Sequence, residues 1–419
     1  MRSIEKFLSM SIDKKINYSF IILRYNQWEL TLQTIETLIK SLNKATITEG
    51  IEIILVDNGS TDSRDQEVFQ FMKDSKFRDI STKQFRLEEN MGYPVGINYG
   101  ISKAEGNILI ILNNDLIFSQ GWFKPLVDYL RKEPDIGVVA PYLSNASGMQ
   151  DVGFYETDLD IIHKYAIAFM RNHQGDTIET NRVIGACMVI KREVIEQVGG
   201  NDFWFGPGHY DDDDWCLRIR IAGYKIAVIG NSFIYHIGSA SFRSSMWNVN
   251  QIIQHNKMKF ISKWQLDIHE TSRDKLIESS IFSSKKHYEP IINADFCNQK
   301  DGDDHKVDGA LFIADWYSDA SAWRKKLEEI LKEKANEKYF IWVPNPYFNL
   351  NESKDLIALQ DFIYLNSVRY ALYKKNISCI HTEVPNIYLL QFVNRFNHII
   401  KIENDVINSY IIKVKEDSL

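Results

Sequence analysis

Four consecutive aspartates, Asp211–Asp214, stand directly before Trp215, Cys216 and Leu217, which are residue types that proteins usually bury. Adjacent carboxylates repel one another, and a buried carboxylate needs a cationic partner, hydrogen bonds or a metal ion. A solvated acidic turn at the start of a helix is one interpretation of this block. The other is a site in which one ionised carboxylate accepts a proton.

Three further side chains suited to phosphate and metal chemistry follow apolar runs that are typical of strands. Asp57 ends the run IEIILVD before a glycine turn, Asp115 follows ILIILNN, and His236 ends FIYH. Mg²⁺ and Mn²⁺ favour carboxylate oxygens, often use only one or two protein carboxylates, and complete their coordination with phosphate and water. A histidine after a strand is also common as a structural residue, so that alternative stays open for His236.

The segments that must position these groups alternate between two periodicities over residues 17–142. Apolar, β-rich runs appear at YSFIILRY, IEIILVD, ILIILNND and IGVVAP, and helical patterns lie between them at 30–42, 66–72, 95–102 and 122–131. This rhythm predicts a parallel sheet covered by helices on both faces. Ligands bind such sheets at the carboxyl ends of the strands, where Asn26, Asp57 and Asp115 are expected.

Residues 143–182 are polar and irregular in pattern, and we expect them to form an insertion or flap. A second core segment follows, with a strand at VIGACMVIK, a helix at REVIEQVGG, and another helix that starts at the acidic block. In that helix Trp215, Ile219 and Ala222 share one face, and Gly223 follows as the expected stop. The aspartates therefore lie at a helix N-terminus, where the backbone dipole favours negative charge.

Taken together, the motifs of residues 17–264 resemble the inverting GT-A glycosyltransferases of family 2. FIILRYNQWELTLQTIETL resembles the first strand and helix, IEIILVDNGSTD the second strand, and ENMGYPVGINYGI the N-x-G-x-x-x-G-x-N-x-G segment. LNNDL stands for the D-x-D metal motif, GACMVIKREVIEQVGG for the acceptor-side strand and helix, and YDDDDWCLRIRIAGY for the E-D-x-D-x-x-x-R block. One such motif is weak evidence, but six in the correct order at sensible spacing are strong evidence.

The resemblance implies a role for each matched residue. Asp212 is the expected catalytic base, with Asp211 beside it in the catalytic block. Asp115 and His236 are expected to hold a divalent metal ion, Mn²⁺ or Mg²⁺. The expected donor-binding residues are Asn26, Asp57, Asn90, Gly92, Asn98 and Asn114. The expected acceptor-binding residues are Trp204, Phe205 and Asp214, with core packing as the alternative for the two aromatics.

Two departures from the family pattern affect these roles. Asn113 replaces the first carboxylate of the D-x-D motif, so His236 is expected to share the metal with Asp115. Asp211 replaces the usual Glu of the acidic block. Further along this block, Asp214 and Arg218 lie four residues apart on one helix face and are expected to pair. Asp213 has no counterpart in the family and is expected to be solvated.

Length, charge and cysteine content limit the class of protein. A chain of 419 residues has room for two or three domains, and a formal net charge of -7 argues against a general nucleic-acid-binding protein. The four cysteines form no C-x-x-C pair and indicate a reducing cytosol. The first residues lack the apolar core of a signal peptide, and the apolar run 108–112 is too short to span a bilayer. We expect a cytoplasmic protein, with peripheral attachment to the inner face of the membrane as an open alternative.

We divide the chain into four segments. These are an N-terminal extension at 1–16, a GT-A domain at 17–264, a linker at 265–305, and a small α/β domain at 306–419. The last segment repeats the strand-helix rhythm, with strands at GALFIAD, YFIWVP, ISCIHTEV and HIIKI, and carries no recognisable metal, phosphate or nucleophile signature. We expect it to serve formation of a homo-oligomer or acceptor recognition.

The predicted activity is transfer of a sugar from a UDP- or dTDP-sugar to a hydroxyl of a glycan, lipid-linked or protein-linked acceptor in bacterial surface polysaccharide or glycoconjugate synthesis. A sugar-nucleotide pyrophosphorylase would need a glycine-rich loop with a lysine after the first strand, and RYNQWE has neither. A non-catalytic nucleotide-sugar-binding scaffold is the other alternative, favoured only by the missing carboxylate at Asn113. The sequence does not identify the donor sugar or the acceptor.

Overall fold

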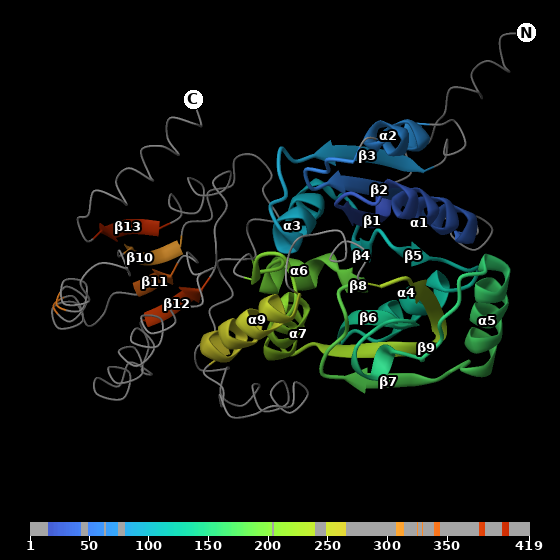
Figure 1. Cartoon of the computed structure of the whole chain (residues 1–419). Helices are drawn as coiled ribbons and strands as arrows, with labels where there is room; N and C mark the ends of the chain where they lie inside the picture. The colour runs from blue at the N-terminus through green and yellow to red at the C-terminus, as the bar shows by residue number, and fades with distance from the viewer. Residues whose placement is uncertain are drawn as a thin grey trace, which may run out of the picture.

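The computed structural model describes residues 16–42, 49–62, 64–73, 80–202, 205–238 and 249–264 of the first two thirds of the chain. In the last third it describes 307–313, 339–343, 377–381 and 396–401, together with the single positions Lys325 and Glu329. These parts contain a large sheet and a small sheet, built from separate stretches of the sequence (Figure 1).

The large sheet has nine strands among the described residues, in the order β3-β2-β1-β4-β8-β6-β9-β5, with β7 paired to β9. The strands are β1 (Ile16–Arg24), β2 (Gly50–Asp57), β3 (Ser81–Arg86), β4 (Ile108–Asn113), β5 (Leu116–Ile117), β6 (Ile136–Leu143), β7 (Thr177–Thr180), β8 (Cys187–Lys191) and β9 (Lys225–His236). The first four neighbours, β3, β2, β1 and β4, are parallel, whereas β8 is antiparallel to both β4 and β6. The carboxyl ends of β1, β2 and β4 therefore meet at one edge.

Strand β1 shows why these segments form the centre of a covered sheet. Its side chains alternate between two hydrophobic clusters, with Phe20 and Ile22 on one face and Ile21 and Leu23 on the other. A strand that is buried on both faces is a near-continuous apolar run, which is the pattern that FIIL shows in the sequence.

Helices cover both faces of this sheet (Figure 1). The first cluster contains side chains from α1 (Trp28–Ser41), α2 (Asp65–Lys73), α4 (Phe123–Lys132) and α5 (Leu159–Asn172). The second contains side chains from α3 (Tyr93–Lys103), α6 (Arg192–Val198) and α7 (Asp211–Ile221). One further helix, α9 (Val249–Trp264), packs against the loop before α7 through Phe260 and Ile261.

The strand-helix alternation predicted over 17–142 is confirmed, with two qualifications. The sheet is mixed, because β8 runs against its neighbours. Strand β3 has the polar sequence STKQFR, and it lies at the edge of the sheet, where an apolar run is unnecessary.

The expectation of an irregular flap at 143–182 is wrong. A short 3-10 turn, η2 (Gly148–Gln150), is followed by the four-turn helix α5 and by β7, which pairs with β9. Helix α5 buries Ile162, Ala166 and Met170 against the sheet. Its other faces are polar or exposed, and this mixture hid the helical periodicity.

The small sheet consists of β10 (Val307–Ile313), β11 (Tyr339–Val343), β12 (Ile377–His381) and β13 (Phe396–Lys401), all parallel, in the order β12-β11-β10-β13. The four strands predicted for this segment are confirmed. The helices predicted between them lie outside the described residues, apart from the exposed positions Lys325 and Glu329. The division of the chain into domains stays a prediction.

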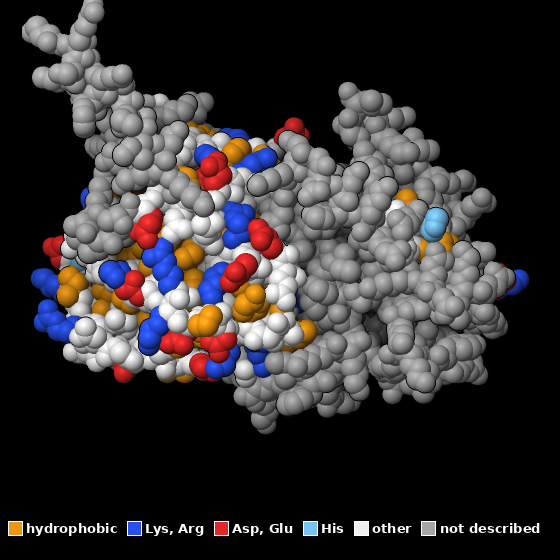
Figure 2. Space-filling model, turned by 180° about the vertical axis from the view of Figure 1, so that it is seen from behind, with side chains coloured by type: hydrophobic (Ala, Val, Ile, Leu, Met, Phe, Trp, Pro, Cys, Tyr) orange, Lys and Arg blue, Asp and Glu red, His pale blue; other side chains and the backbone are white. Residues whose placement is uncertain are grey.

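Two observations concern the surface. Figure 2 shows basic and acidic side chains interspersed over the described part of the face that it displays. No helix within the described residues combines the length and the apolar character needed to cross a bilayer.

Candidate active site

The acidic block lies where the sequence places it, at the start of α7. The chain reaches the helix through His209 and Tyr210, both with positive φ, and no side chain caps the first turn. Asn256 of α9 holds this loop, because its side-chain amide donates hydrogen bonds to the carbonyls of Phe205, Gly208 and His209 at 2.8, 2.7 and 3.0 Å. The sequence analysis did not single out Asn256, because it lies in a helical stretch that carries none of the family motifs.

The four aspartates of α7 differ in burial. Asp211, Asp213 and Asp214 are buried, at 4%, 0% and 0% exposure, whereas Asp212 is only half-buried. A base that takes a proton from an acceptor must be reachable, and among these four side chains Asp212 meets that condition best.

Asp214 and Arg218 form the ion pair that their spacing predicted. The Arg218 Nε donates to Asp214 Oδ2 at 2.8 Å, and both side chains are fully buried. The Arg218 Nη1 and Nη2 groups donate to the carbonyls of Val198 and Gly200, each at 2.7 Å. The expected acceptor-binding role of Asp214 is therefore wrong for this structure, since its carboxylate faces a buried guanidinium and has no solvent-exposed surface.

The expectation for Asp213 is also corrected. It was expected to be solvated, but it is fully buried with its Oδ1 3.5 Å from the Nη1 of Arg182. Arg182 also reaches the Ser147 hydroxyl at 3.4 Å, so one cation ties the start of α7 to the loop after β6. A buried carboxylate requires such a partner, and the sequence offers no local signal for one that is 31 residues away.

Asp212 is held by the loop that precedes β8. The backbone N–H of Gly185 donates to Asp212 Oδ2 at 3.2 Å, and the Gly185 carbonyl accepts the hydroxyl of Tyr93 at 2.9 Å. Burial raises the pKa of Tyr93 well above its ordinary value, and the carboxylates of Asp211 and Asp212 raise it further. Tyr93 therefore stays a neutral phenol that donates a hydrogen bond to the Gly185 carbonyl.

Asp115 and His236 face one another at the end of β4. The Asp115 Oδ1 lies 3.3 Å from the His236 Nε2, and the antiparallel pairing of β5 with β9 aligns the two residues. This Oδ1 is buried and has no hydrogen bond within the described part of the chain, and its contact with His236 is an ion pair when the imidazole is protonated. The Nδ1 of His236 lies 3.0 Å from the Asn145 carbonyl, which can only accept a hydrogen bond, so Nδ1 carries a proton and Nε2 is the nitrogen that faces Asp115.

This pair suits a divalent metal ion that completes its coordination with phosphate and water. One carboxylate oxygen and one imidazole nitrogen are acceptable ligands for Mn²⁺ or Mg²⁺. Among the described residues, no group of three or more His, Cys, Asp or Glu side chains is placed to hold a metal ion by itself. Burial alone would lower the pKa of His236, but its contacts with Asp115 and with the Asn145 carbonyl outweigh burial and raise that pKa.

Backbone contacts link the Asp212 site to the Asp115 site. The residue after Gly185 is Ala186, and its carbonyl accepts the N–H of Asn113 at 3.0 Å, two residues before Asp115. The sheet edge therefore brings together the residues that the sequence predicted as base and metal ligands.

The ends of β1 and β2 form a separate, strongly charged cluster. Asp57 is fully buried, accepts the Ser60 N–H at 2.9 Å, and has its Oδ2 3.8 Å from both Arg24 and Arg86. Arg24 is also fully buried and pairs with Asp62 at 2.6 Å. The sequence analysis did not single out either arginine. Arg24 is a charged residue that directly follows the apolar run FIIL at the end of β1, and this position could have indicated a functional role.

Asn26 joins this cluster through the backbone. Its Oδ1 accepts the N–H of Thr61 at 2.8 Å, and its own N–H donates to the Ser60 hydroxyl at 2.7 Å. Both Asn26 and the following Gln27 have positive φ, so the chain turns sharply between β1 and α1. The predicted donor residues Asn26 and Asp57 therefore lie on neighbouring turns.

Asn90 and Gly92 belong to the turn before α3. The Asn90 Oδ1 accepts hydrogen bonds from Asn58 Nδ2 and from the Gly92 N–H, at 2.9 and 3.0 Å. At Gly92, which has a φ of 87°, a Cβ would lie 2.4 Å from the Gly206 carbonyl oxygen. Only glycine allows the loop before α3 to approach the loop before α7 this closely.

Two predicted donor residues have structural roles. Both ends of the Asn98 amide bond the backbone of Asn201, at 2.7 and 2.8 Å. The Asn114 amide nitrogen donates to the Thr31 hydroxyl of α1 at 2.9 Å. Both asparagines are buried and bond neighbouring groups of the protein, and their donor-binding role stays a prediction.

The predicted acceptor platform is also partly corrected. Phe205 has no exposed surface and packs against Tyr210, Leu217 and Phe260, so it offers no ring face to a sugar. Phe205 is therefore a core residue, which was the alternative interpretation of this ring. Trp204 lies outside the described residues.

Residues 19–199 match the family model described as "Glycosyl transferase family 2". The chain is 24% identical over 238 residues to Glycosyltransferase GlyG of Streptococcus pneumoniae, covering 55% of this chain and 74% of that one. It is 26% identical to O-antigen biosynthesis protein RfbC of Myxococcus xanthus (50% of this chain, 17% of that one) and 22% identical to Poly-beta-1,6-N-acetyl-D-glucosamine synthase of Staphylococcus aureus (54% and 50%). The chain thus spans half or less of the length of the last two relatives.

Partial similarity to solved structures accompanies these matches. GalNAc-T7, solved with UDP, GalNAc and Mn²⁺, aligns at 16% identity with a TM-score of 0.47, over 60% of this chain and 49% of that one. Mannosyltransferase PcManGT from Pyrobaculum calidifontis, solved with GDP-Man and Mn²⁺, aligns at 14% identity with a TM-score of 0.44, over 88% and 93%.

Proposed function

Because residues 19–199 belong to glycosyl transferase family 2, we propose that this chain transfers a sugar, with inversion, from a nucleoside-diphosphate sugar to a hydroxyl of a glycan or glycoconjugate. The observation that carries this proposal is the shared sheet edge. There, a reachable carboxylate, Asp212, is linked through Gly185 and Ala186 to the facing pair of Asp115 and His236.

The proposed reaction uses Asp212 as the general base. The acceptor oxygen forms a bond to the anomeric carbon while the bond from that carbon to the diphosphate oxygen breaks and its electron pair leaves with the diphosphate. The hydroxyl proton passes to Asp212, and such proton transfer contributes about 10²–10⁴ in rate. The Gly185 N–H holds one oxygen of this carboxylate, which fixes the orientation of the base.

Asp115 and His236 are the proposed ligands of Mn²⁺ or Mg²⁺. A metal bound there would neutralise negative charge on the leaving diphosphate. Asn145 supports this site, since its carbonyl keeps the proton of His236 on Nδ1. The raised pKa of His236 implies that protons compete with the metal, so metal binding should weaken as the pH falls.

Asp57 and Asn26 are the proposed donor contacts on the nucleoside side, in line with the family resemblance. Arg24 at the end of β1 and Arg86 at the end of β3 both lie next to the Asp57 carboxylate and hold it in place. We propose a UDP- or dTDP-sugar as donor. We propose glycan assembly as the setting, which agrees with the names of the relatives in O-antigen and poly-N-acetylglucosamine synthesis. A cytoplasmic location, at or near the inner face of the membrane, completes the proposal.

A binding and hydrolysis experiment tests this function. The melting temperature of the full chain should rise with UDP, dTDP or GDP in the presence of Mn²⁺, and slow hydrolysis of a matching nucleotide sugar should be detectable. Asp115→Ala should lose the Mn²⁺-dependent part of the stabilisation. Absence of nucleotide binding under all these conditions would refute the proposal, whereas binding without hydrolysis of any donor or transfer would favour a non-catalytic scaffold.

A further inference from the structure

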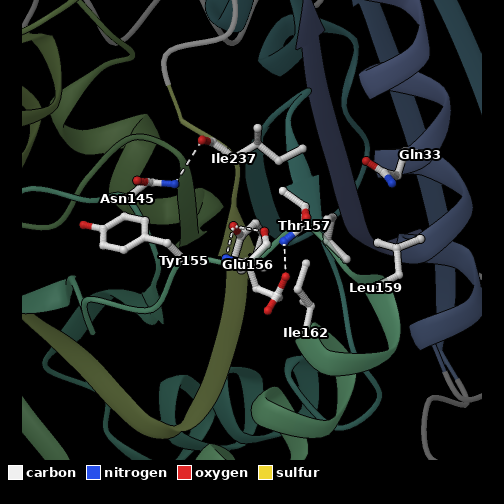
Figure 3. Close-up of a pocket in the computed structure, with 10 residues that line it drawn as sticks. Gln33, Asn145, Tyr155, Glu156, Thr157, Leu159, Ile162 and Ile237 are labelled. Atoms are coloured by element: carbon white, nitrogen blue, oxygen red, sulfur yellow. Dashed lines mark hydrogen bonds between the residues drawn. The ribbon is translucent and has the colours of Figure 1, made fainter.

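A pocket of about 540 Å³ lies beside the β5–β9 pair and is lined by Ile117 of β5 and Tyr235 of β9. It is formed by Gln33 of α1, Ile117 of β5, the end of β9, Asn145, the segment before α5, and the first turn of that helix (Figure 3). Every residue that lines the pocket belongs to the part of the chain that the structure describes. Its volume lies within the range of roughly 300–1,000 Å³ that is usual for small-ligand sites.

The lining combines an apolar wall with polar groups. The wall comes from Ile117, Leu159, Ile162, Tyr235 and Ile237, and the polar side chains include Gln33, Glu156 and Thr157. Glu156 is the one charged side chain in this lining, and the lining contains no Lys, Arg or His. A phosphate, a nucleotide or another anion would meet a carboxylate without a counter-charge, so the pocket suits an uncharged ligand with both CH faces and hydroxyl groups.

The rim of the pocket is held in place before any ligand arrives. Tyr155 is 61% exposed, with its hydroxyl 3.4 Å from Asp151, whereas its neighbour Phe154 stacks on Tyr165 at 3.7 Å. The Glu156 N–H donates to the Tyr235 hydroxyl at 3.0 Å, and Glu156 Oε1 accepts the N–H groups of Thr157 and Asp158. The Tyr155 ring therefore offers a flat, exposed apolar surface on a segment that hydrogen bonds already hold in place. Binding a ligand to such a surface costs little conformational entropy.

The pocket shares one wall with the proposed metal pair. The Asn145 carbonyl lies 3.0 Å from His236 Nδ1, and the Asn145 amide donates to the His236 carbonyl at 3.0 Å. The same amide donates to the Ile237 carbonyl at 3.0 Å (Figure 3). A ligand in this pocket therefore lies next to the residues that orient His236.

We propose that this pocket is a binding subsite for an uncharged saccharide, with the ring of Tyr155 as a stacking surface. A sugar ring has apolar CH faces and a polar rim, which match the wall and the polar groups of this lining. The natural occupant is a part of the acceptor glycan remote from the reacting hydroxyl, and this identification alone rests on the proposed function. Saccharide binding itself does not require transferase activity.

The test is binding of the full chain to an array of neutral and anionic oligosaccharides without nucleotide or metal. The best neutral ligand is then titrated by calorimetry against four variants. Tyr155→Ala should weaken binding about tenfold through loss of the aromatic contact, and Tyr155→Phe should retain it. Leu159→Trp should narrow the pocket and abolish binding. Ile167→Trp is the matched control, since Ile167 is an exposed residue of the same helix that does not line the pocket and should bind as the wild type does.

Several outcomes would overturn the subsite. These are no neutral glycan bound by the folded wild type, preferred binding of anionic glycans, wild-type affinity in both Tyr155→Ala and Leu159→Trp, or equal loss in Ile167→Trp. Binding of UDP with Mn²⁺, measured on the same preparation, reports on the proposed function separately. Either proposal can therefore fail while the other stands.

Discussion

Acidic residues lie at the starts of helices α5 and α7, and the two groups of carboxylates make different contacts. Before α5, Glu156 and Asp158 accept hydrogen bonds from backbone N–H groups at the start of their own helix. In α7, Asp212 and Asp213 contact Gly185 and Arg182, which lie outside the helix, and Asp214 pairs with Arg218 of the same helix. The acids of α5 are local caps, whereas those of α7 connect the helix to the rest of the site.

This difference shows what a cluster of aspartates at a helix start does and does not establish. The first N–H groups of any helix need acceptors, and Asp is among the residues that supply them best. The residue before helix α7, Tyr210, makes no side-chain cap, and within the first turn Asp212 Oδ1 accepts the N–H of Asp213 at 3.0 Å. Burial then separates them, because Asp213 and Asp214 are fully buried while Asp212 remains reachable.

The largest effect that we expect concerns the Asp214–Arg218 pair. Asp214→Ala leaves the buried Arg218 guanidinium without its carboxylate, and such a change destabilises a protein by about 3–5 kcal/mol. Chemical denaturation of the full chain measures this loss. Glu36→Ala is the matched control, since Glu36 and Lys40 form an exposed pair at the same spacing, for which the expected loss is about 0.3–0.5 kcal/mol. Equal losses in the two variants would show that the burial of the α7 pair has no energetic consequence.

The second effect separates Asp212 from its neighbours. Asp212→Asn should lower turnover of the donor at least about 100-fold, the scale of a lost general base, while nucleotide binding stays near the wild-type level. Steady-state kinetics with a nucleotide sugar that the wild type hydrolyses gives this ratio. Asp211→Asn is the companion variant. Near-normal turnover in Asp212→Asn together with an inactive Asp211→Asn would move the role of base to Asp211.

The sequence was sufficient where the signal is local. Apolar runs such as FIIL and ILIIL predicted the central strands, and the spacing of Asp214 and Arg218 predicted their pair. That Asp115 and His236 meet was expected from the family resemblance alone, and the antiparallel pairing of β5 with β9 brings them together. The family match confirms the GT-A type of α/β fold that these motifs implied.

The remaining contacts depend on residues that are far apart in the chain. Asp213 was expected to be solvated because it has no counterpart in the family pattern, and no local signal pointed to its partner Arg182, which lies 31 residues earlier. Asn98 and Asn114 match the family motif by position, but their amides bond Asn201 and Thr31, contacts that no sequence pattern announces. Helix α5 was missed because its apolar residues are not confined to one face: Ile162 and Met170 are buried, whereas Ile161 and Ile167 are exposed.

A third, smaller effect tests the local nature of the α5 cap. The Asp158 carboxylate accepts the N–H groups of Asp160 and Ile161 at 2.8 and 3.2 Å, so Asp158→Ala should cost about 1 kcal/mol of stability. Asp158→Asn should restore most of it, because Asn caps as well as Asp does. Asp160→Ala removes an acid from the same turn without removing the cap. If Asp160→Ala destabilises the chain as much as Asp158→Ala does, the helix dipole rather than the cap determines the effect.

The smallest effect concerns the pH dependence of the same turn. Hydrogen bonds from the N–H groups of Thr157 and Asp158 hold the pKa of Glu156 below its ordinary value of 4.5. Since the pKa is lower in the folded chain, the ionised carboxylate stabilises the fold above about pH 4.5, and this contribution is lost as the pH falls through the lowered pKa. The melting temperature of the wild type should therefore exceed that of Glu156→Gln near neutral pH, and the difference should shrink in acid. A difference in melting temperature that stays constant with pH would mean that the charge of Glu156 does not contribute to the stability of the fold. The Glu156 side chain would then stabilise the α5 turn only as a neutral hydrogen-bond acceptor does.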